Sequence, residues 1–469
     1  MSARISRPTR SPPYTREGVS MLTIDFLGAA GTVTGSKYSI TYGRHHLMVD
    51  CGMFQGEEEL VERNRESWPH PARDYDALLL THAHIDHSGA IPRFVADGFD
   101  GPILCTEPTI ELCELLLPDS AKIMRSEGNP LFSDENAQQA LQLMEGCRYY
   151  KQYEVFPGVG VTFFDAGHIL GSAWLELEFD PLPEWPEQRP VRVVFSGDLG
   201  RGLSPLLAPP DRPDRADFLI LESTYGGRLH TRVSATSQLR EAVERVQRQR
   251  STLVIPAFAV QRSQDIAYLF ETLGVGNISL YVDSPMAARA IRVFERYPDY
   301  LSKKAGQLLN EYEQLLRYPH LRVCETSEQS RAILNFRAPR VIVSASGMAE
   351  GGRVLHHLRH HLPDARSLIL LAGYQCEGTR GWQLQSGDAY LDIDGRSIPV
   401  RAEVETLDGL SGHADYAEIS DWLSDLDRPP QATFLVHGDE ESLQAQQHRL
   451  SQRGWRVEVP EHRQRFQLI

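Results

Sequence analysis

Residues 78–89 read Leu-Leu-Leu-Thr-His-Ala-His-Ile-Asp-His-Ser-Gly, which places three imidazoles and one carboxylate within six residues at the end of an apolar run. Imidazole and carboxylate groups suit Zn²⁺, and Mn²⁺ or iron also accept them. The alternative is a surface cluster of histidines, or histidines whose hydrogen bonds are satisfied inside a core. A four-ligand pattern that follows a strand is among the more specific short motifs, so the stretch predicts a metal site.

The spacing of these ligands indicates two metal ions. Residues 76–80 are predicted to form a buried strand, so His82 and His84 project to the same side of the extended chain and share one ion. Asp86 and His87 follow where the extended pattern breaks, so the turn directs this second pair toward a neighbouring ion. The pattern HxHxDH resembles the signature of the metallo-β-lactamase fold, a four-layer αββα sandwich that holds its metals at the edge of two sheets.

Length, composition and charge limit the class of protein. With 469 residues, of which 41% are hydrophobic, the chain is long enough for two domains with full cores. The formal net charge of −15 argues against a protein that coats nucleic acid through a general basic field. An anionic substrate would therefore need a local site, such as bound metal.

Cysteine usage and the ends of the chain bear on location. The six cysteines show no CxxC pair, which favours the reduced cytoplasm over export. No apolar run approaches membrane-spanning length, so no membrane association is expected. Residues 1–20 lack the apolar segment of a signal peptide, and we expect a disordered leader or a start codon assigned upstream of Met21.

Two more polar residues follow apolar strands later in the chain. His168 lies between glycines just after one such strand, which makes it a natural third ligand for the first metal. Asp198 ends the next strand, and its two oxygens can bridge both ions. Turn chemistry is the alternative for both residues, but their order and spacing favour the metal site. Helices over residues 107–117 and 135–147 are predicted to cover the sheet.

Prolines at positions 205, 209, 210 and 213 mark a crossing into a second domain. From there to about residue 395, apolar strands alternate with helical stretches, which predicts a doubly wound sheet. His413 and His437 then return to ligand-like chemistry, so the C-terminus closes the first domain. The expected organisation is a leader at 1–20, a first domain formed by 21–207 and 404–469, and an inserted domain at 208–403.

Together these features resemble the β-CASP RNA-processing nucleases, the branch of the metallo-β-lactamase superfamily that includes ribonuclease J and the endonuclease subunit of the cleavage and polyadenylation specificity factor. That branch has a long insert after its bridging aspartate, an acidic residue at the start of the insert, and two late histidines. Glu222 in ESTYG, His413 in SGHADY and His437 in LVHG match these positions. The insert carries four more similar motifs, which are FAVQRSQ at 258–264, DSPM at 283–286, SASGM at 344–348 and AGYQCEG at 372–378.

The resemblance implies an α/β fold in which a metallo-β-lactamase αββα sandwich carries an inserted β-CASP domain with a doubly wound parallel sheet. It also implies two Zn²⁺ ions, for which Mn²⁺ is a substitute. The implied ligands are His82, His84 and His168 for one ion, Asp86, His87 and His437 for the other, and Asp198 between them. Asp50 is implied to orient the ligands without binding metal, the alternative being a plain turn carboxylate.

The implied activity is that of a zinc-dependent phosphodiesterase that hydrolyses single-stranded RNA as an endonuclease, with or without exonuclease action. His413, paired with Glu222, is implied to protonate the leaving 3′ oxygen, and Asp86 joins this catalytic set. The alternative is that His413 only holds a phosphate oxygen. A histidine at position 437 resembles the RNA-processing members more than the DNA-repair members, which favours RNA.

Substrate contacts are predicted in the insert. Ser344, Ser346 and Gly347 are small residues between a strand and the next helix, where backbone N–H groups can cradle a phosphate. Arg262, in one of the insert motifs, completes the predicted substrate-binding set. Four histidines at 356, 357, 360 and 361 have metal-binding spacing on one helix, but we interpret them as a solvated or domain-facing surface.

Two other functions compete with this interpretation. A small-molecule hydrolase of the same fold, acting on an ester, thioester or lactone, would lack the large insert between Asp198 and His413. A non-catalytic RNA-processing partner subunit would have lost ligands, whereas this chain keeps all seven. A homodimer is compatible with the sequence.

Overall fold

The computed structural model describes residues 21–181, 185, 187–230 and 233–469, so the predicted leader lies outside the described residues. The chain divides into two compact units. Unit 1 consists of Met1–Gly200, Pro209–Leu229 and His413–Ile469, and unit 2 consists of Arg201–Ala208 and His230–Gly412. In the described part of the chain, no helix has both the length and the apolar composition needed to cross a membrane.

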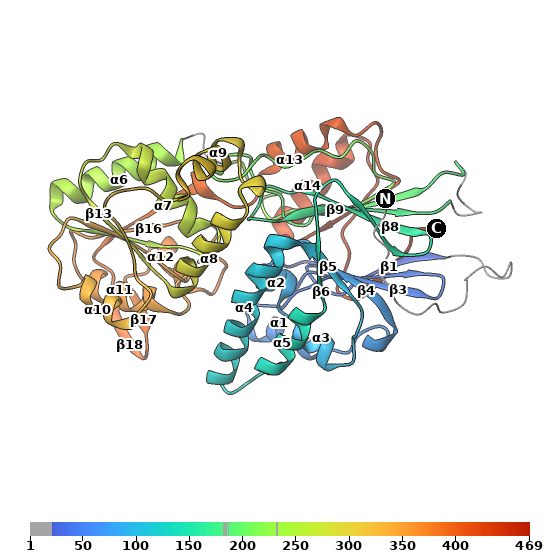
Figure 1. The fold of residues 1–469 in the computed structure, drawn as a ribbon, viewed down its shortest axis with the longest axis horizontal. Coiled ribbons are helices and arrows are strands. Elements are labelled where there is room, and N and C mark those ends of the chain that lie inside the picture. The colour runs from blue at the N-terminus through green and yellow to red at the C-terminus, as the bar shows by residue number, and fades with distance from the viewer. Residues whose placement is uncertain (1–20, 182–184, 186, 231–232) are drawn as a thin grey trace. The chain divides into compact units, whose positions relative to one another are not determined.

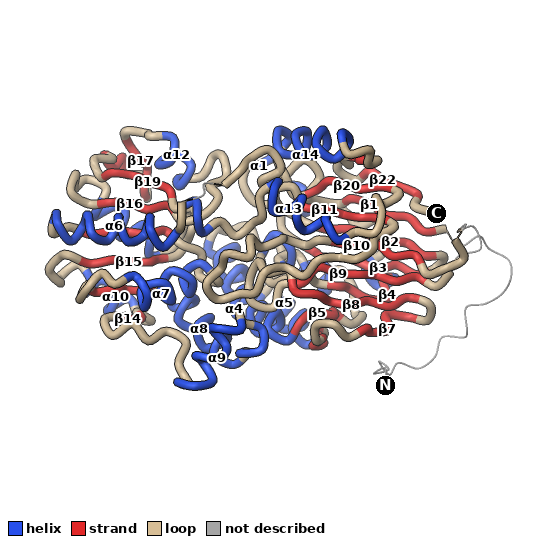
Figure 2. The backbone as a smooth tube through the Cα atoms, turned by 90° about the horizontal axis from the view of Figure 1, so that it is seen from above, coloured by secondary structure: helices blue, strands red, loops and turns tan. Residues whose placement is uncertain are grey.

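Unit 1 contains two seven-stranded sheets. The first sheet has the order β22 (Gln464–Gln467), β1 (Leu22–Phe26), β2 (Lys37–Tyr42), β3 (His45–Cys51), β4 (Tyr75–Leu79), β5 (Ile103–Thr106) and β6 (Met144–Cys147). The second has the order β21 (Val457–Glu458), β20 (Ala432–Val436), β11 (Phe218–Glu222), β10 (Val191–Phe195), β9 (Ala173–Phe179), β8 (Val159–Asp165) and β7 (Gln152–Phe156). Figure 2 shows strands of the two sheets running in similar directions.

Helices cover the outer face of each sheet in unit 1 (Figure 1). Beside the first sheet lie α1 (Glu58–Glu62), α2 (Ile85–Ser88), α3 (Ile91–Ala96), α4 (Glu107–Ser126) and α5 (Asp134–Gln142). Beside the second lie α13 (Tyr416–Trp422) and α14 (Glu440–Gln452). This arrangement is the predicted four-layer αββα sandwich.

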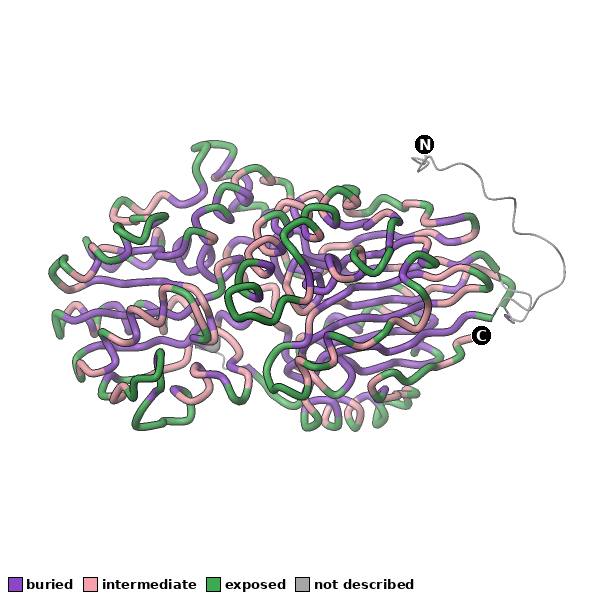
Figure 3. Tube along the Cα trace, turned by 90° about the horizontal axis from the view of Figure 1, so that it is seen from below, coloured by how far each residue is buried: buried purple, intermediate pink, exposed green. Residues whose placement is uncertain are grey.

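Alternating side chains of the second sheet fill two separate cores. Val193, Ile220 and Phe434 point between the two sheets, where they join a core with residues of β1 to β4. Their neighbours Val194 and Leu435 point the other way and pack with residues of α13 and α14. Because successive residues of a strand face opposite sides, strands that are apolar throughout are what a sheet covered on both faces requires. Figure 3 shows the strands of unit 1 as buried along much of their length.

The structure corrects two predicted helices. The helix predicted over 135–147 is wrong at its end, because α5 stops at Gln142 and Met144–Cys147 forms β6 beside β5. Burial of Cys147 in the core and backbone pairing outweigh the helical pattern there. The helix predicted over 107–117 is too short, since α4 continues through Pro118 to Ser126 and buries two more side chains, those of Ala121 and Met124.

Unit 2 is built around a six-stranded sheet in which every strand pair is parallel. Its order is β14 (Leu321–Val323), β13 (Ser279–Asp283), β15 (Arg340–Ser344), β12 (Thr252–Pro256), β16 (Leu368–Leu371) and β19 (Glu403–Thr406). A hairpin of β17 (Tyr390–Ile393) and β18 (Arg396–Pro399) lies outside this sheet. The predicted alternation of strands and helices is therefore confirmed.

The helices of unit 2 follow its strands in the order expected for a doubly wound sheet. They are α6 (Ala235–Gln249), α7 (Arg262–Leu273), α8 (Pro285–Arg296), α9 (Lys303–Tyr312), α10 (Ser327–Ile333), α11 (Arg353–His361) and α12 (Arg380–Ser386). In Figure 1, α6 and α7 lie on one side of the sheet and α11 and α12 on the other. The strand β11, which the predicted boundary at 208 assigned to the insert, pairs with β10 and β20 and so lies in unit 1.

Candidate metal centre

Strand ends of unit 1 deliver polar side chains to one edge of the sandwich. β3 runs parallel to β4, and β10, β11 and β20 are mutually parallel. Because the carboxyl ends of parallel strands meet at one edge of a sheet, the residues that follow them converge. His82 follows β4, Asp198 follows β10 and His437 follows β20.

The first donor set consists of His82, His84, His168 and one oxygen of Asp198. His84 Nδ1 lies 3.1 Å from both His82 Nε2 and His168 Nε2. Asp198 Oδ2 lies 3.4 Å from His82 Nε2 and 3.5 Å from His168 Nε2. In a tetrahedral zinc site with bonds of about 2.0–2.1 Å, two ligand atoms are about 3.3 Å apart, so the set fits one such ion.

The protonation of these imidazoles also suits metal binding. Burial lowers the pKa of His82 to about 3 and that of His84 to about 4. Burial and the neighbouring His413 hold the pKa of His168 well below its usual range. The three rings are therefore neutral at neutral pH, as a nitrogen ligand must be.

The second donor set consists of Asp86, His87, His437 and the other oxygen of Asp198. Asp198 Oδ1 lies 3.1 Å from His87 Nε2 and 3.7 Å from His437 Nε2. His437 Nε2 also lies 3.4 Å from Asp86 Oδ2. These distances between donor atoms are again close to those between ligand atoms around one zinc ion, so the residues fit a second ion.

Asp198 thus presents one oxygen to each donor set. The residue is 2% exposed, and among the described residues its Oδ1 has no hydrogen-bond partner despite lying close to two imidazoles. Burial raises the pKa of this carboxyl, but the nearby His437 and His87 outweigh burial and hold it well below the usual range. A buried anionic oxygen without a hydrogen bond is costly unless a cation compensates it, which is what a bridging ligand needs.

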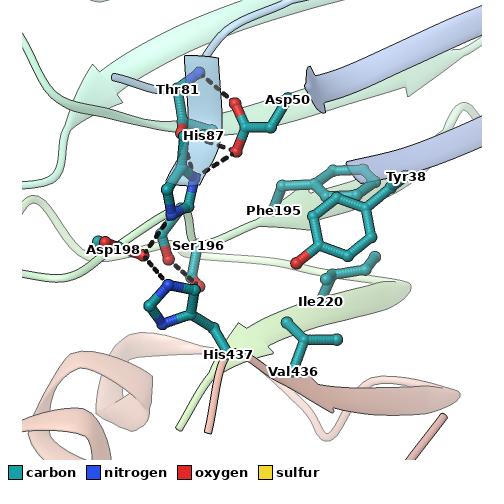
Figure 4. A pocket seen from close by; sticks show the side chains of 11 residues that line it. Tyr38, Asp50, Thr81, His87, Phe195, Ser196, Asp198, Ile220, Val436 and His437 are labelled. Carbon is teal, nitrogen blue, oxygen red and sulfur yellow. Dashed lines mark hydrogen bonds and ion pairs between the residues drawn. The ribbon is translucent and has the colours of Figure 1, made fainter. Parts of the chain in front are cut away.

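Asp50 lies behind the second set rather than in it (Figure 4). Its Oδ2 lies 2.7 Å from His87 Nδ1, and its two oxygens accept the backbone N–H and the hydroxyl of Thr81 at 2.8 and 2.9 Å. Burial lowers the pKa of His87, but Asp198 and Asp50 outweigh burial and raise it well above its usual range. An ion at the second set would therefore displace the Nε2 proton, while the Nδ1–H continues to donate to Asp50. A cavity of about 10 Å³ beside these residues has room for at most one water molecule.

Two threonines support the histidines, and the sequence analysis missed both. Thr81 Oγ1 lies 3.1 Å from His82 Nδ1, and Thr224 Oγ1 lies 2.9 Å from His437 Nδ1. Each hydroxyl can fix the orientation of the ring that it contacts. Thr81 lies inside the histidine motif and Thr224 lies two residues after Glu222, so proximity to predicted ligands was the available signal.

His413 differs in charge from the three histidines of the first donor set. Its Nδ1 lies 3.2 Å from Glu222 Oε1 and 3.9 Å from Asp198 Oδ2, and its side chain is 17% exposed. Burial lowers the pKa of this imidazole, but Glu222 and Asp198 outweigh burial and raise it to about 9. His413 is therefore a cation at neutral pH that can donate a proton, although its position beside Asp198 and His437 also places it near a donor set.

The predicted substrate-binding residues all lie in unit 2. Ser344 is fully buried and its hydroxyl donates to the Asp283 carbonyl, whereas the Ser346 hydroxyl accepts the backbone N–H groups of Glu350 and Gly351. A side chain at Gly347 would clash with Phe258, because an added Cβ would lie 2.9 Å from that ring. Arg262 is buried at the start of α7, with its Nη1 3.4 Å from Asp265 Oδ2.

The interpretation of the histidine helix as a solvated or domain-facing surface is wrong for two of its four residues. His357 is fully buried, with Nε2 2.7 Å from Asp283 Oδ2, and His361 is 4% exposed. These two rings face the sheet of unit 2 because they lie four residues apart, one helical turn, on the buried face of α11. His356 is half-buried and His360 is exposed.

Three segments of the chain match known protein families. Residues 31–142 match the metallo-β-lactamase superfamily, residues 263–384 match the β-CASP domain, and residues 397–460 match the zinc-dependent metallo-hydrolase RNA specificity domain. The first two matches agree with the sandwich of unit 1 and the sheet of unit 2.

Similar proteins span nearly the whole chain. Ribonuclease TTHA0252 of Thermus thermophilus is 36% identical over 92% of this chain and 96% of its own length. The transcription termination factor FttA of Methanocaldococcus jannaschii is 31% identical over 89% of this chain and 67% of its own length. A crystal structure of a protein of unknown function from Enterococcus faecalis shares the fold, with a TM-score of 0.55 at 14% identity over 95% of this chain and all of that one.

Proposed function

The chain belongs to the β-CASP branch of the metallo-β-lactamase superfamily, and from this premise we propose that it is a metal-dependent ribonuclease that hydrolyses phosphodiester bonds of single-stranded RNA. The relative from Thermus thermophilus is named a ribonuclease and covers 92% of this chain. The observation that carries the proposal is that the two carboxylate oxygens of Asp198 face different donor sets. Its Oδ2 faces the first set and its Oδ1 faces the second. Two adjacent cation sites are what phosphodiester hydrolysis uses to clamp both the attacking and the leaving oxygen.

We assign two Zn²⁺ ions to these sites, with Mn²⁺ as a substitute, because the donors are imidazoles and carboxylates. His82, His84 and His168 would hold one ion, Asp86, His87 and His437 would hold the other, and Asp198 would contribute an oxygen to each. When bound, the two ions supply the positive charge that activates water and stabilises the phosphorane-like transition state. Burial raises the pKa of Asp86, but its contacts with His437 and His87 outweigh burial and lower it. Asp86 therefore remains an anion, and its oxygens stay available as ligands.

His413 is the general acid in this proposal. Glu222 accepts the Nδ1–H of His413 and holds the ring, so the Nε2–H is left to protonate the leaving 3′ oxygen. Glu222 is itself fixed, since its two oxygens accept the backbone N–H groups of Leu199 and Thr224. The carboxylate therefore sets the tautomer and supports the imidazolium without transferring the proton to substrate.

We further propose that Ser346 and Gly347 of the loop after β15, together with Ser344 and Arg262, contribute to RNA binding. The small residues of this loop allow close approach of a phosphate to the backbone. The reducing compartment expected from the six cysteines remains a prediction.

The test is to incubate metal-quantified protein with end-labelled single-stranded RNA, single-stranded DNA of the same sequence, and a chromogenic ester. We expect RNA to be cleaved and the ester to be left largely intact. Cleavage of the ester with no action on RNA would favour the small-molecule hydrolase, and inertness toward all three in a metal-loaded sample would favour the non-catalytic subunit.

A further inference from the structure

A second polar pocket lies within unit 2, at the edge of the sheet where its parallel strands begin. It has a volume of about 230 Å³. On the same scale about 10–15 Å³ holds one water molecule, so the pocket has room for a polyatomic anion together with water. The side chains that matter for its charge and hydrogen bonding are those of Arg250, Ser251, Arg340, His360, His361, Asp364 and Arg366.

The topology of the sheet explains why these residues meet. Strands β15 and β12 are neighbours, so Arg340, the first residue of β15, lies beside Ser251, which directly precedes β12 and accepts the Arg340 backbone N–H. The helices α6 and α11 run back from the other edge; Arg250 directly follows the last residue of α6, and His361 is the last residue of α11. A doubly wound sheet therefore gathers strand starts and helix ends at this edge.

Three buried groups at this pocket have unused hydrogen-bonding capacity. Within the described residues, Arg340 Nε, His361 Nε2 and Ser251 Oγ have no hydrogen-bond partner. Their residues are 5%, 4% and 3% exposed. Buried polar groups are nearly always satisfied, so three orphaned atoms in residues that line one pocket indicate a partner. Each of these atoms has almost no accessible surface, so the side chains must turn slightly toward the pocket when that partner binds.

The charge around the pocket specifies the sign of that partner. The guanidinium of Arg340 donates through Nη1 to the carbonyls of Ile333 and Phe336, and in the described chain no carboxylate pairs with it. Asp364 is the acidic residue of the lining, and it is engaged by Arg366 through two bonds of 3.0 and 3.1 Å. In the part of the chain that the structure describes, the buried guanidinium of Arg340 is therefore left without an anionic partner, and the exposed Arg250 adds a second positive charge at the pocket.

The protonation of His361 agrees with positively charged surroundings. Burial, together with the nearby His360 and Arg340, lowers the pKa of this imidazole to about 3. Its Nδ1 lies 3.4 Å from the Ser367 hydroxyl. When Nδ1 accepts from that hydroxyl, Nε2 carries the hydrogen and can donate to an anion.

A competing explanation is compensation of helix dipoles, because basic residues are favoured at the C-terminal ends of helices. It accounts for Arg250 and His360, which lie at or near the ends of α6 and α11. It does not account for Arg340, which is buried at the start of a strand, or for the orphaned Ser251 hydroxyl. A buried guanidinium without an anion is costly, so a bound anion explains more of the site.

We propose that this pocket is a phosphate-binding site formed by Arg340, Ser251, His361 and Arg250. The guanidinium and hydroxyl groups match the oxygen acceptors of a phosphate, which Arg binds through charge-assisted hydrogen bonds. The phosphate is either free or the terminal group of a mononucleotide. The site is separate from the proposed nuclease chemistry, since none of its residues belongs to either donor set.

The test is calorimetric titration of the full-length, metal-loaded protein with inorganic phosphate and, separately, with adenosine 5′-monophosphate. The main variant combines Ser251→Ala with Arg250→Asn. The Ser251 hydroxyl has no hydrogen-bond partner to lose, and Asn tolerates the left-handed backbone of Arg250, whose φ is 51°. Arg248→Gln is the matched control, because it removes an exposed charge from the same helix without touching the pocket.

The double variant should bind phosphate about tenfold more weakly than the wild type, and Arg248→Gln should remain within about twofold. Asp364→Asn, which removes the acidic residue of the lining, should bind about threefold more tightly. Tighter binding of the nucleotide than of phosphate would identify a mononucleotide as the source, and the reverse would identify the free anion. Equal phosphate affinity in the wild type and the double variant, or no measurable binding at all, would overturn the site.

Discussion

His413 Nδ1 lies 3.2 Å from Glu222 Oε1, and Glu222 ends the buried strand β11 while the His413 ring keeps an exposed edge. The same carboxylate accepts two backbone N–H groups, so it cannot turn away from the ring without losing them. A fixed carboxylate behind a partly exposed imidazole is the arrangement that a general acid needs.

Removal of the His413 side chain should therefore slow the reaction without removing metal. We expect His413→Ala to retain the metal content of the wild type and to cleave RNA roughly 10²–10⁴-fold more slowly. The loss should shrink for a substrate whose leaving group needs no proton, such as a 3′ nitrophenolate. Glu222→Gln should show a weaker form of the same pattern. Loss of metal from the His413 variant, or an equal loss of rate with both leaving groups, would assign His413 to metal or phosphate binding.

The position of Asp198 between the two donor sets predicts that its loss affects both. Asp198→Ala should hold much less metal than His437→Ala, because His437 contacts only the second set. The measurement is metal content per chain by inductively coupled plasma mass spectrometry after gel filtration. His356→Ala is the control, since this histidine lies in unit 2 and should leave metal content unchanged. Equal metal loss in the Asp198 and His437 variants would contradict the bridging role.

The hydroxyl of Thr224 should matter for metal affinity although it binds no metal. Thr224→Val removes the group that contacts His437 Nδ1, and loss of such a contact typically weakens metal binding by about 10–100-fold. Competition with a chelator of known affinity measures this change. Thr433→Val is a matched control, because Thr433 lies on β20, four residues before His437, and its buried hydroxyl has no partner among the described residues. Similar metal affinities for the two variants would contradict a role of the Thr224 hydroxyl in metal binding.

The stability of unit 2 should depend on Asp283. Its buried carboxylate contacts Arg353, Ser330 and His357. Asp283→Asn should destabilise the protein at pH 7 by about 3 kcal/mol, because it leaves buried partners uncompensated. Asp388→Asn, an exposed change in the same unit, should have little effect. The measurement is chemical denaturation followed by circular dichroism.

The effect of Asp283 should also depend on pH. Burial raises the pKa of this carboxyl, but its contacts with His357, Ser330 and Arg353 outweigh burial and lower it below the ordinary 3.8. A carboxyl with a depressed pKa contributes stability above its unfolded pKa and loses it as the pH falls through the folded pKa. The difference between the wild type and Asp283→Asn should therefore be constant near neutral pH and shrink below about pH 4. A difference that grows on acidification would contradict the charge of Asp283.

Much of the candidate site could be predicted because its chemistry is concentrated at strand ends. His82, His84, Asp86 and His87 lie within one short motif, and local spacing was enough to expect two neighbouring sites. His413 and His437 lie hundreds of residues away, so their place beside Asp198 could be expected only from the resemblance to a family.

The features of the site and the fold that could not be predicted depend on contacts between residues far apart in the sequence, which no local pattern encodes. Thr81 and Thr224 are ordinary hydroxyl residues until the fold brings them against imidazole rings. His357 was predicted to be part of a surface cluster. It is buried instead, in contact with Asp283, which lies 74 residues earlier in the chain. The end of the helix predicted over 135–147 failed for the same reason, because pairing with β5 decides the structure there.

The most direct test of the central claim is the rate of single-stranded RNA cleavage measured against metal content per chain, with zinc returned stepwise to chelated protein. We expect no cleavage without metal, a rate that rises to its maximum near two ions per chain, and no recovery in Asp198→Ala at any zinc concentration. Cleavage that persists in metal-free protein, or full recovery in Asp198→Ala, would contradict a nuclease built on two metal sites that share this carboxylate.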